Sequence, residues 1–245
     1  MKQDRRCVII GAAGIRNYEK IRTYLREEDF YIYCDAGLKH QELLGVRPDL
    51  IIGDFDSYGK AEMEQKYLQA GASACGGEAG VPEHGRQAGT GGSARIPELI
   101  VLPCEKDDTD TVFAAKEALR RGFEDFLLVG VIGQRLDHTF GNVSILYMLE
   151  EADAKGIILD DYSEMQLITE HAAQPTEIED SFAYFSLLNV SGQAEGITIT
   201  NAKYPLQDAS ITCEYQYGIS NEVLPGKTAS AAVAKGKLLL IKVFA

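Results

Sequence analysis

The order of strand and helix signals along the chain constrains its fold more than any other feature. Over the first half, short apolar runs alternate with segments of helical spacing, as in a parallel α/β sheet. From about Met165 onward no long helical pattern occurs, and alternating or β-branched runs are separated by turn residues. We therefore expect two domains: an α/β domain with a parallel sheet over residues 1–160, and an antiparallel β-sandwich over residues 161–245.

The apolar runs and their stops place the individual elements. Helices are expected at 18–25, 38–44, 109–121 and 137–151. Strands of the first half are expected at 7–10, 30–34, 50–52, 99–102, 126–129 and 156–159. Strands of the second half are expected at 165–169, 182–188, 197–201, 211–215 and 237–244. Residues 71–95 are dense in glycine and poor in large apolar residues, which predicts a mobile surface insertion.

The charge of the chain limits its partners. The net charge is −13 and the sequence pI is about 4.8. Non-specific nucleic-acid binding and docking on anionic lipid both need a basic face, so we expect neither nucleic acid nor membrane as a partner. No apolar stretch is long enough for a signal peptide or a membrane span. The five cysteines contain no CxxC pair, which indicates reduced thiols and a cytoplasmic protein.

Acidic residues gather where the expected strands of the first half end. They are Asp35 after the second strand, Asp54 and Asp56 after the third, Asp107, Asp108 and Asp110 after the fourth, and Asp137 after the fifth. In an open α/β sheet, ligands bind outside the carboxyl ends of the strands. Carboxylates gathered there repel one another unless cations neutralise them, and such a cluster suits Mg²⁺. The alternative is that Asp107, Asp108 and Asp137 are helix N-caps.

Two basic side chains lie among these acids. Lys106 directly precedes Asp107, and Arg135 is two positions before Asp137. Cationic side chains would help to balance the negative charge of a polyphosphate in an acidic pocket. Lys106 with Asp107, and Arg135 with Asp137, could equally form surface salt bridges. His138 is better explained as a first-turn helix residue than as a base, since nothing in the sequence pairs it with a nucleophile. The glycines of residues 11–14 are only a weak phosphate-loop signal, and no GxxxxGK[ST] motif occurs.

Four motifs in order along the chain resemble those of the thiamine pyrophosphokinase family. They are Gly53-Asp54-Phe55-Asp56-Ser57, Lys106-Asp107-Asp108-Thr109-Asp110, Gly133-x-Arg135-Leu136-Asp137-His138 with Asn142, and Gly218-Ile219-Ser220-Asn221-Glu222, preceded by Tyr204-Pro205-Leu206. Each motif alone is weakly specific, but four in the family's order extend over nearly the whole chain. The glycine-rich insertion and the residues Val131, Ile132 and Gln134 depart from the family pattern.

The resemblance implies an α/β catalytic domain, a C-terminal β-sandwich, and transfer of a pyrophosphoryl group from ATP to thiamine with release of AMP. It also implies Mg²⁺ and a homodimer that binds thiamine where one subunit's sandwich meets its partner's α/β domain. Catalytic roles are implied for Asp56, Asp110, Arg135 and Asp137, with Asp110 or Asp137 as the proton acceptor. Metal ligands are implied at Asp54, Asp56, Asp107 and Asp110. ATP contacts are implied at Asp35, Lys106, Asp108, Arg135, His138 and Asn142. Thiamine contacts are implied at Ser220 and Asn221, which a plain β-turn would also explain.

Three other functions remain open at this point. Asp54 and Asp56 after a strand also fit a phosphatase of the haloacid dehalogenase type, as a covalent nucleophile and a general acid. A pterin pyrophosphokinase on a related fold would differ in its substrate. A non-catalytic sensor of thiamine or a nucleotide would bind without forming AMP.

Overall fold

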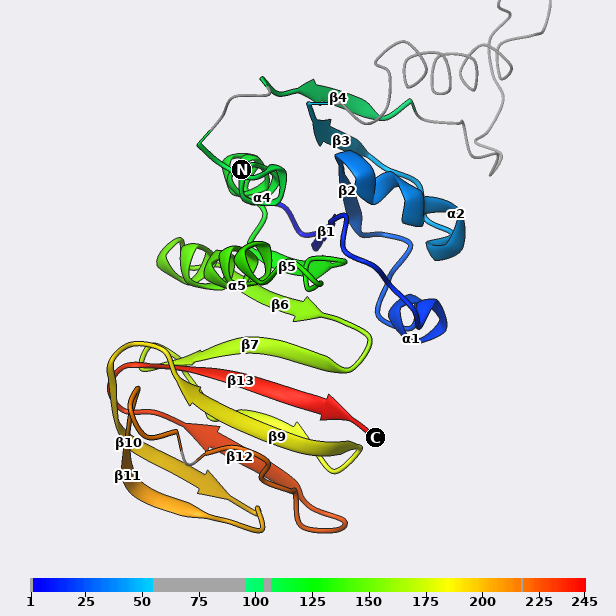
Figure 1. Cartoon of the computed structure of the whole chain (residues 1–245). Coiled ribbons are helices and arrows are strands. Elements are labelled where there is room, and N and C mark those ends of the chain that lie inside the picture. The colour runs from blue at the N-terminus through cyan, green and yellow to red at the C-terminus, as the bar shows by residue number, and fades with distance from the viewer. Residues whose placement is uncertain (1, 55–95, 104–106, 217) are drawn as a thin grey trace, which may run out of the picture.

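The computed structural model describes residues 2–54, 96–103, 107–216 and 218–245 (Figure 1). Asp56, Lys106 and the expected insertion at 71–95 lie outside the described residues.

Six parallel strands form the first part of a large sheet. They are β1 (Cys7–Ile10), β2 (Phe30–Cys34), β3 (Leu50–Gly53), β4 (Glu98–Val101), β5 (Asp125–Val129) and β6 (Lys155–Leu159). Their order is β4-β3-β2-β1-β5-β6, and every neighbouring pair is parallel. The chain builds outward from β1 in one direction and then crosses to β5 on its other side. The gap between β1 and β5 is therefore the switch point of the sheet, where α/β proteins bind their ligands.

The same sheet continues without a break into the second half of the chain. The added strands are β7 (Ser163–Thr169), β9 (Phe182–Asn189) and β13 (Lys237–Phe244). β6 pairs with β7 in antiparallel fashion, and the order then runs β7-β13-β9, which gives nine strands among the described residues (Figure 1). One sheet of the C-terminal sandwich is thus the extension of the parallel sheet.

A separate antiparallel sheet completes the sandwich. Its strands are β8 (Thr176–Glu179), β10 (Gln193–Thr200), β11 (Leu206–Thr212) and β12 (Thr228–Ala232), in the order β11-β10-β12-β8. It packs on the extended part of the large sheet through a common core in which Ile197 and Ile199 of β10 join Leu238 and Leu240 of β13. The expected fold class, a parallel α/β sheet followed by an antiparallel sandwich, is confirmed.

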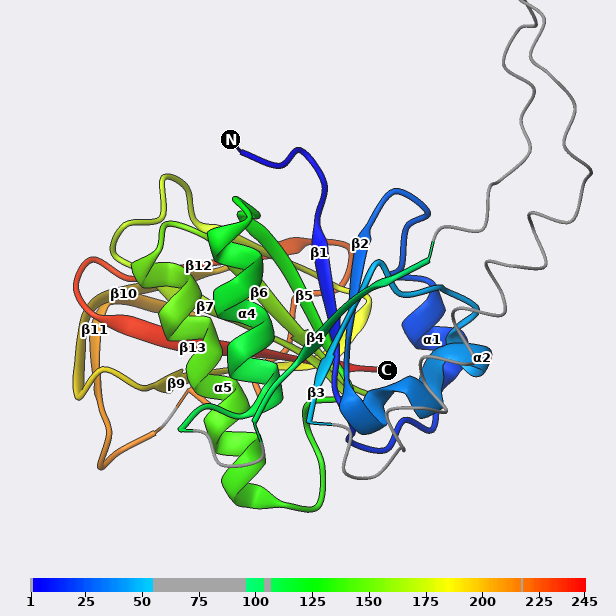
Figure 2. The same cartoon turned by 90° about the horizontal axis from the view of Figure 1, so that it is seen from above.

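Helices cover both faces of the parallel strands. They are α1 (Tyr18–Arg22), the 3₁₀ helix η1 (Asp35–His40), α2 (Gln41–Leu44), α4 (Asp110–Arg120) and α5 (Leu136–Glu151). Alternate residues of β1 serve the two faces, because successive side chains of a strand point in opposite directions. Cys7 and Ile9 share a core with α4 and α5, whereas Val8 and Ile10 share one with α1 and α2. Figures 1 and 2 show these two pairs of helices on opposite sides of β1.

Several expected bounds need correction. The helix expected at 18–25 ends at Arg22, and the segment expected to be helical at 38–44 begins earlier as the 3₁₀ helix. The strand expected at 211–215 lies instead at Leu206–Thr212. β8 and β12 were not expected, because their short, weakly apolar sequences carry little strand signal. α4 agrees closely with its expected range, and it ends before Gly122, whose φ of 88° suits a glycine after a helix.

Candidate active site at the switch point

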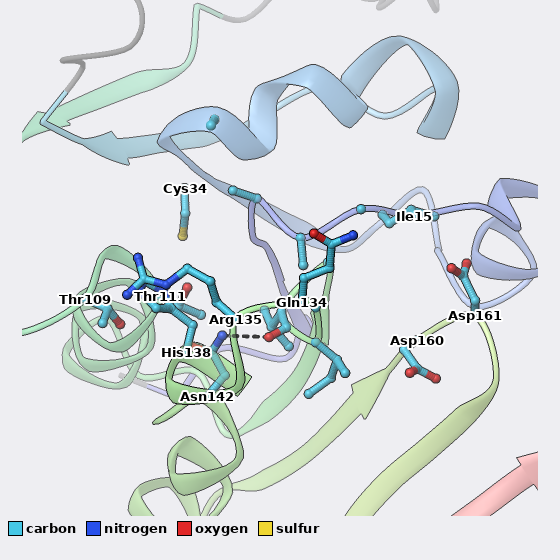
Figure 3. Close-up of a pocket in the computed structure, with 18 of the residues that line it drawn as sticks. Ile15, Cys34, Thr109, Thr111, Gln134, Arg135, His138, Asn142, Asp160 and Asp161 are labelled. Atoms are coloured by element: carbon cyan, nitrogen blue, oxygen red, sulfur yellow. Dashed lines mark hydrogen bonds between the residues drawn. The ribbon is translucent and has the colours of Figure 1, made fainter. Parts of the chain in front are cut away.

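A cavity of about 850 Å³ lies at the switch point of the sheet. Its walls come from segments that follow strand ends: residues 12–16 after β1, 34–36 after β2, 130–135 after β5 and 160–162 after β6, together with 109–111 at the start of α4. The cavity therefore lies at the edge of the sheet where the strand-end rule expects a ligand site. Figure 3 shows Thr109 and Cys34 on one side of the cavity, with Asp160 and Asp161 on the other.

Close backbone contacts between strand ends shape the floor of the cavity. A Cβ atom on Gly130, whose φ is 65°, would lie 2.8 Å from the carbonyl oxygen of Gly11. A Cβ atom on Gly53 would lie 2.8 Å from the Cβ of Asp35. Only glycine permits such approaches. The glycine before Asp54 thus brings the end of β3 against Asp35.

Asp35 and Asp110 are the two sequence-predicted acids that line the cavity. Asp35 directly follows β2 with an unusual φ of 31°, and Asp110 begins α4. One carboxylate oxygen of each is shielded from solvent. The Cys34 thiol lies near both, and burial together with the charges of Asp110 and Asp35 raises its pKa. This cysteine therefore remains protonated near neutral pH.

The neighbouring acids are arranged differently. Asp107 is exposed, and Asp108 forms an ion pair with Lys116 at 2.7 Å; neither lines the cavity. The N-cap of α4 is Thr109, whose side chain accepts a hydrogen bond from the amide of Val112 at 3.3 Å, so the N-cap alternative for Asp107 and Asp108 is wrong. Asp54, directly after β3, is outside the cavity wall. Within the described ranges, no group of three His, Cys, Asp or Glu side chains is placed to hold a metal.

Arg135 and Asp137 form an ion pair at the mouth of the cavity. Arg135 Nη2 lies 2.5 Å from Asp137 Oδ2, and the side chains are 70% and 65% exposed. The hydrogen bond from Arg135 lowers the pKa of Asp137 to about 2. Arg135 and His138 line the cavity, whereas Asp137 does not. Asp137 is also not the N-cap of α5, because Arg135 takes that position without a capping side chain.

Asn142 fixes the loop that follows β5. Its buried side chain donates a hydrogen bond to the carbonyl oxygen of Val131 at 2.7 Å (Figure 3). One turn earlier on α5, Thr139 Oγ1 accepts from the amide of Gly133 at 3.1 Å. Helix α5 thus holds the loop at two points. Although Asn142 lines the cavity, its amide nitrogen is used to position this loop.

The predicted thiamine contacts lie in the sandwich half, away from this cavity. The Asn221 side chain is buried and hydrogen-bonded through both of its polar atoms: its oxygen accepts from the amides of Tyr204 at 3.0 Å and Glu222 at 2.9 Å, and its nitrogen donates to the carbonyl oxygen of Tyr204 at 2.8 Å. Asn221 therefore ties two loops together. Ser220 is exposed, with a φ of 58°.

The structure adds cavity residues that the sequence interpretation missed. Arg16, Gln134, Asp160 and Asp161 all line the wall. Asp160 and Asp161 follow the sixth strand, so the strand-end rule that selected the other acids would have found them. Arg16 carries no comparable signal in the sequence.

The fold and cavity together define an α/β protein with an acidic ligand site at the switch point of its sheet, joined to an antiparallel sandwich. Two family models match the chain in succession. The model described as thiamin pyrophosphokinase, catalytic domain, matches residues 93–158, and the one described as thiamin pyrophosphokinase, vitamin B1 binding domain, matches residues 170–238. The chain belongs to the thiamin pyrophosphokinase family.

Individual relatives agree over the full length. The thiamine pyrophosphokinase of Bacillus subtilis (strain 168) is 27% identical over 234 residues, which cover 95% of this chain and 96% of that protein. A crystal structure of thiamine pyrophosphokinase from Bacillus subtilis shares the fold with a TM-score of 0.75 at 24% identity, covering 98% of this chain and 99% of the other. One of thiamin pyrophosphokinase from Geobacillus thermodenitrificans gives a TM-score of 0.72 at 26% identity, with 98% of each chain covered.

None of the described helices has the length and hydropathy of a membrane span.

Proposed function

We propose that this protein is a thiamine pyrophosphokinase, which transfers the pyrophosphoryl group of ATP to the hydroxyethyl oxygen of thiamine and releases AMP. The observation that carries this proposal is the succession of both family halves along one chain, with the predicted acids Asp35 and Asp110 meeting in a cavity in the first half. The proposed division of labour follows the same boundary: residues 1–160 would bind ATP, and residues 161–245 would bind thiamine.

The acids of the cavity fit Mg²⁺ in its usual mode with nucleotides. Mg²⁺ in such sites takes one or two protein carboxylates and completes its shell with water and phosphate oxygens. Asp35 and Asp110 offer two carboxylates to one cavity, so the described residues fit this mode and do not form an all-protein cage. When bound, the ion would neutralise charge on the transferring phosphates. The predicted ligand Asp56 lies outside the described residues, and Asp54 stays a prediction.

The protein's own groups would then orient the substrates and accept a proton. The hydroxyl oxygen of thiamine attacks the β-phosphorus in line, and AMP leaves through the α–β bridging oxygen. Asp110 is the better proton acceptor, because Asp137 lies off the cavity and the lowered pKa of its carboxylate makes it a weak base. Arg135 would hold non-bridging phosphate oxygens, and Asn142 would maintain the loop that carries Arg135.

A homodimer and a cytoplasmic location complete the proposal. The predicted thiamine segment at Ser220 lies outside the cavity, and in a homodimer a second copy of the chain would bring its sandwich to the cavity. Exposed apolar side chains near this segment, Tyr184, Tyr204 and Ile219, support an interface there. Sedimentation of the purified protein should give twice the monomer mass. The free thiols of Cys7, Cys34 and Cys213 support a reducing compartment.

The decisive experiment is product analysis. Purified protein with ATP, Mg²⁺ and thiamine should release AMP and thiamine diphosphate in equal amounts, and AMP should not form without thiamine. ADP as the product would exclude the pyrophosphoryl transfer. A trapped aspartyl-phosphate with burst release of phosphate would support the phosphatase alternative, activity only with a pterin would support the related kinase, and thiamine binding without AMP would support a sensor.

A further inference from the structure

We propose that Asp161 is a positioning residue, which fixes the cavity-lining segment 12–17 from the neighbouring hairpin between β6 and β7. Its carboxylate accepts hydrogen bonds from the backbone amide of Arg16, at 3.0 Å to each oxygen, and from that of Asn17 at 2.8 Å. Bonds from an amide to a charged carboxylate are stronger than those between neutral groups. The contact joins residues 144 positions apart in sequence.

Segment 12–17 needs such support because it has little regular structure of its own. It precedes α1, which has only five residues, and the side chain of Asn17 caps that helix by accepting from the amide of Lys20 at 3.0 Å. A helix this short gives little stability to the chain before it. Residues 12–16 nevertheless form one wall of the cavity, so the position of their backbone decides the shape of the site.

Hydrogen bonds to the rest of the protein fix the two ends of the segment separately. At the first end, the Ala13 amide donates to the carbonyl oxygen of Gly130 at 2.8 Å, His40 Nε2 lies 2.8 Å from the carbonyl oxygen of Ala13, and Lys39 Nζ donates to that of Ala12 at 2.5 Å. Asp161 provides the anchor at the second end, at residues 16 and 17. A segment fixed at both ends keeps one conformation, and loss of one anchor frees that end.

Asp161 can act as an anchor because its own turn is rigid. The carboxylate of Asp160 accepts from the amides of Tyr162 at 2.9 Å and Ser163 at 2.6 Å, and the amide of Asp160 donates to the carbonyl oxygen of Ser163 at 3.0 Å. The two adjacent acids therefore have different tasks: Asp160 closes the turn, and Asp161 holds the distant segment.

The first test measures the link itself, in the full-length protein without substrates. Asp161→Ala should speed hydrogen exchange of the amides of Arg16 and Asn17 about tenfold or more, since it removes hydrogen bonds to a charged group. Asp161→Asn should give an intermediate rate, because one acceptor oxygen remains. The control is Asp180→Ala, which removes a similar bond, from the Gly226 amide at 2.9 Å, in an exposed turn of the sandwich. Unchanged exchange at residues 16 and 17 in Asp161→Ala would overturn the proposal.

The second test measures the consequence for the site, and only here does the inference rest on the proposed function. Asp161→Ala should raise the KM for ATP about tenfold with a smaller change in kcat, because the wall is displaced while the reacting groups remain. Asp180→Ala should keep the wild-type constants. Faster exchange with an unchanged KM for ATP would show that the link is only structural and would overturn the positioning role. If the wild-type protein forms no AMP, the proposed function fails instead, and the exchange rates still decide whether Asp161 holds the segment.

Discussion

The guanidinium of Arg135 lies 2.5 Å from Oδ2 of Asp137, with both side chains exposed beside the cavity. The surface salt bridge that the sequence left as an alternative is therefore present. It does not exclude a role in binding, because a guanidinium has five N–H donors and can hold a carboxylate and a phosphate together. The ion pair raises the pKa of Arg135 and holds its guanidinium beside Asp137.

Replacement of Arg135 tests this role. Arg135→Ala should lower kcat/KM for ATP by about a hundredfold, as expected when a donor to developing charge is lost. The midpoint of thermal unfolding should not change, since an exposed ion pair contributes little to stability. Arg135→Lys should recover only part of the activity, because a lysine lacks the planar fork. The control is Arg120→Ala, which removes an exposed guanidinium from its ion pair with the buried Glu117 on α4. Equal kinetic effects of the two alanine variants would contradict the role.

We expect the carboxylate of Asp110 to be required for turnover. Asp110→Asn keeps the size of the side chain but removes its charge and its ability to take up a proton, so kcat should fall by about a hundredfold or more. Asp125→Asn changes an exposed acid at the first residue of β5, at the other end of that strand from the cavity, and should leave kcat unchanged. Circular dichroism and thermal unfolding should show that both variants are folded. A fully active Asp110→Asn protein would remove this residue from the mechanism.

Protonation of His40 should destabilise the protein at low pH. The ring is buried, with Nε2 donating to the carbonyl oxygen of Ala13 and Nδ1 accepting from the hydroxyl of Tyr18 at 2.7 Å. Burial lowers the pKa of His40 below 6.5, so the unfolded chain binds this proton more readily. The stabilising effect of the neutral ring is therefore complete above pH 6.5 and is lost as the pH falls through the lowered pKa.

Denaturant unfolding of a variant isolates this effect. His40→Gln keeps a donor and an acceptor but cannot titrate, so its free energy of unfolding should fall less than that of the wild type between about pH 7 and pH 5. His171→Gln removes an exposed histidine and should keep the wild-type pH dependence. If the free energy of unfolding depends on pH in the same way in the wild type and in His40→Gln, His40 does not contribute to that dependence.

The ion pair between Glu164 and Lys242 is buried between neighbouring strands. The atoms lie 2.6 Å apart with side chains 7% and 10% exposed, and the hydroxyl of Tyr24 donates to the same carboxylate at 2.5 Å. Lys242→Met should lower the free energy of unfolding by about 3 kcal/mol, because it leaves a buried charge without its partner. The double variant with Glu164→Gln should recover part of that loss, since the remaining charge is also removed. If the double variant loses as much free energy of unfolding as the two single variants together, the two residues do not interact.

Much of the fold was predictable because its signals are local. The run Cys7–Ile10 and the helix before Gly122 were placed within a residue, since apolar length and a glycine stop depend only on nearby sequence. β12 was not predictable, because Thr228–Ala232 has only small residues, and it becomes a strand through pairing with β10 and β8 on its two sides.

The site was predictable only in part. The strand-end rule selected Asp35 and Asp110 because the carboxyl ends of parallel strands lie along the same edge of a sheet. The rule could not tell that Asp110 lines the cavity and Asp107 does not, because this depends on the turn in which α4 begins. The thiamine contact at Asn221 stays a prediction, and only the structure shows that its side chain is hydrogen-bonded to the backbone of Tyr204. The partner of Asp161 lies far away in sequence, so no local pattern identifies it.

The pairing of β6 with β7 has a consequence for modularity. The two halves of the chain match separate family models, yet the antiparallel pairing of Ile158 with Met165 makes them parts of one sheet. Separation of the halves at this hairpin would leave the paired edges of β6 and β7 with free amides and carbonyls, and such edges are templates for aggregation. The two halves are therefore poor candidates for expression as separate pieces or for exchange between proteins, and they can be expected to change together during evolution.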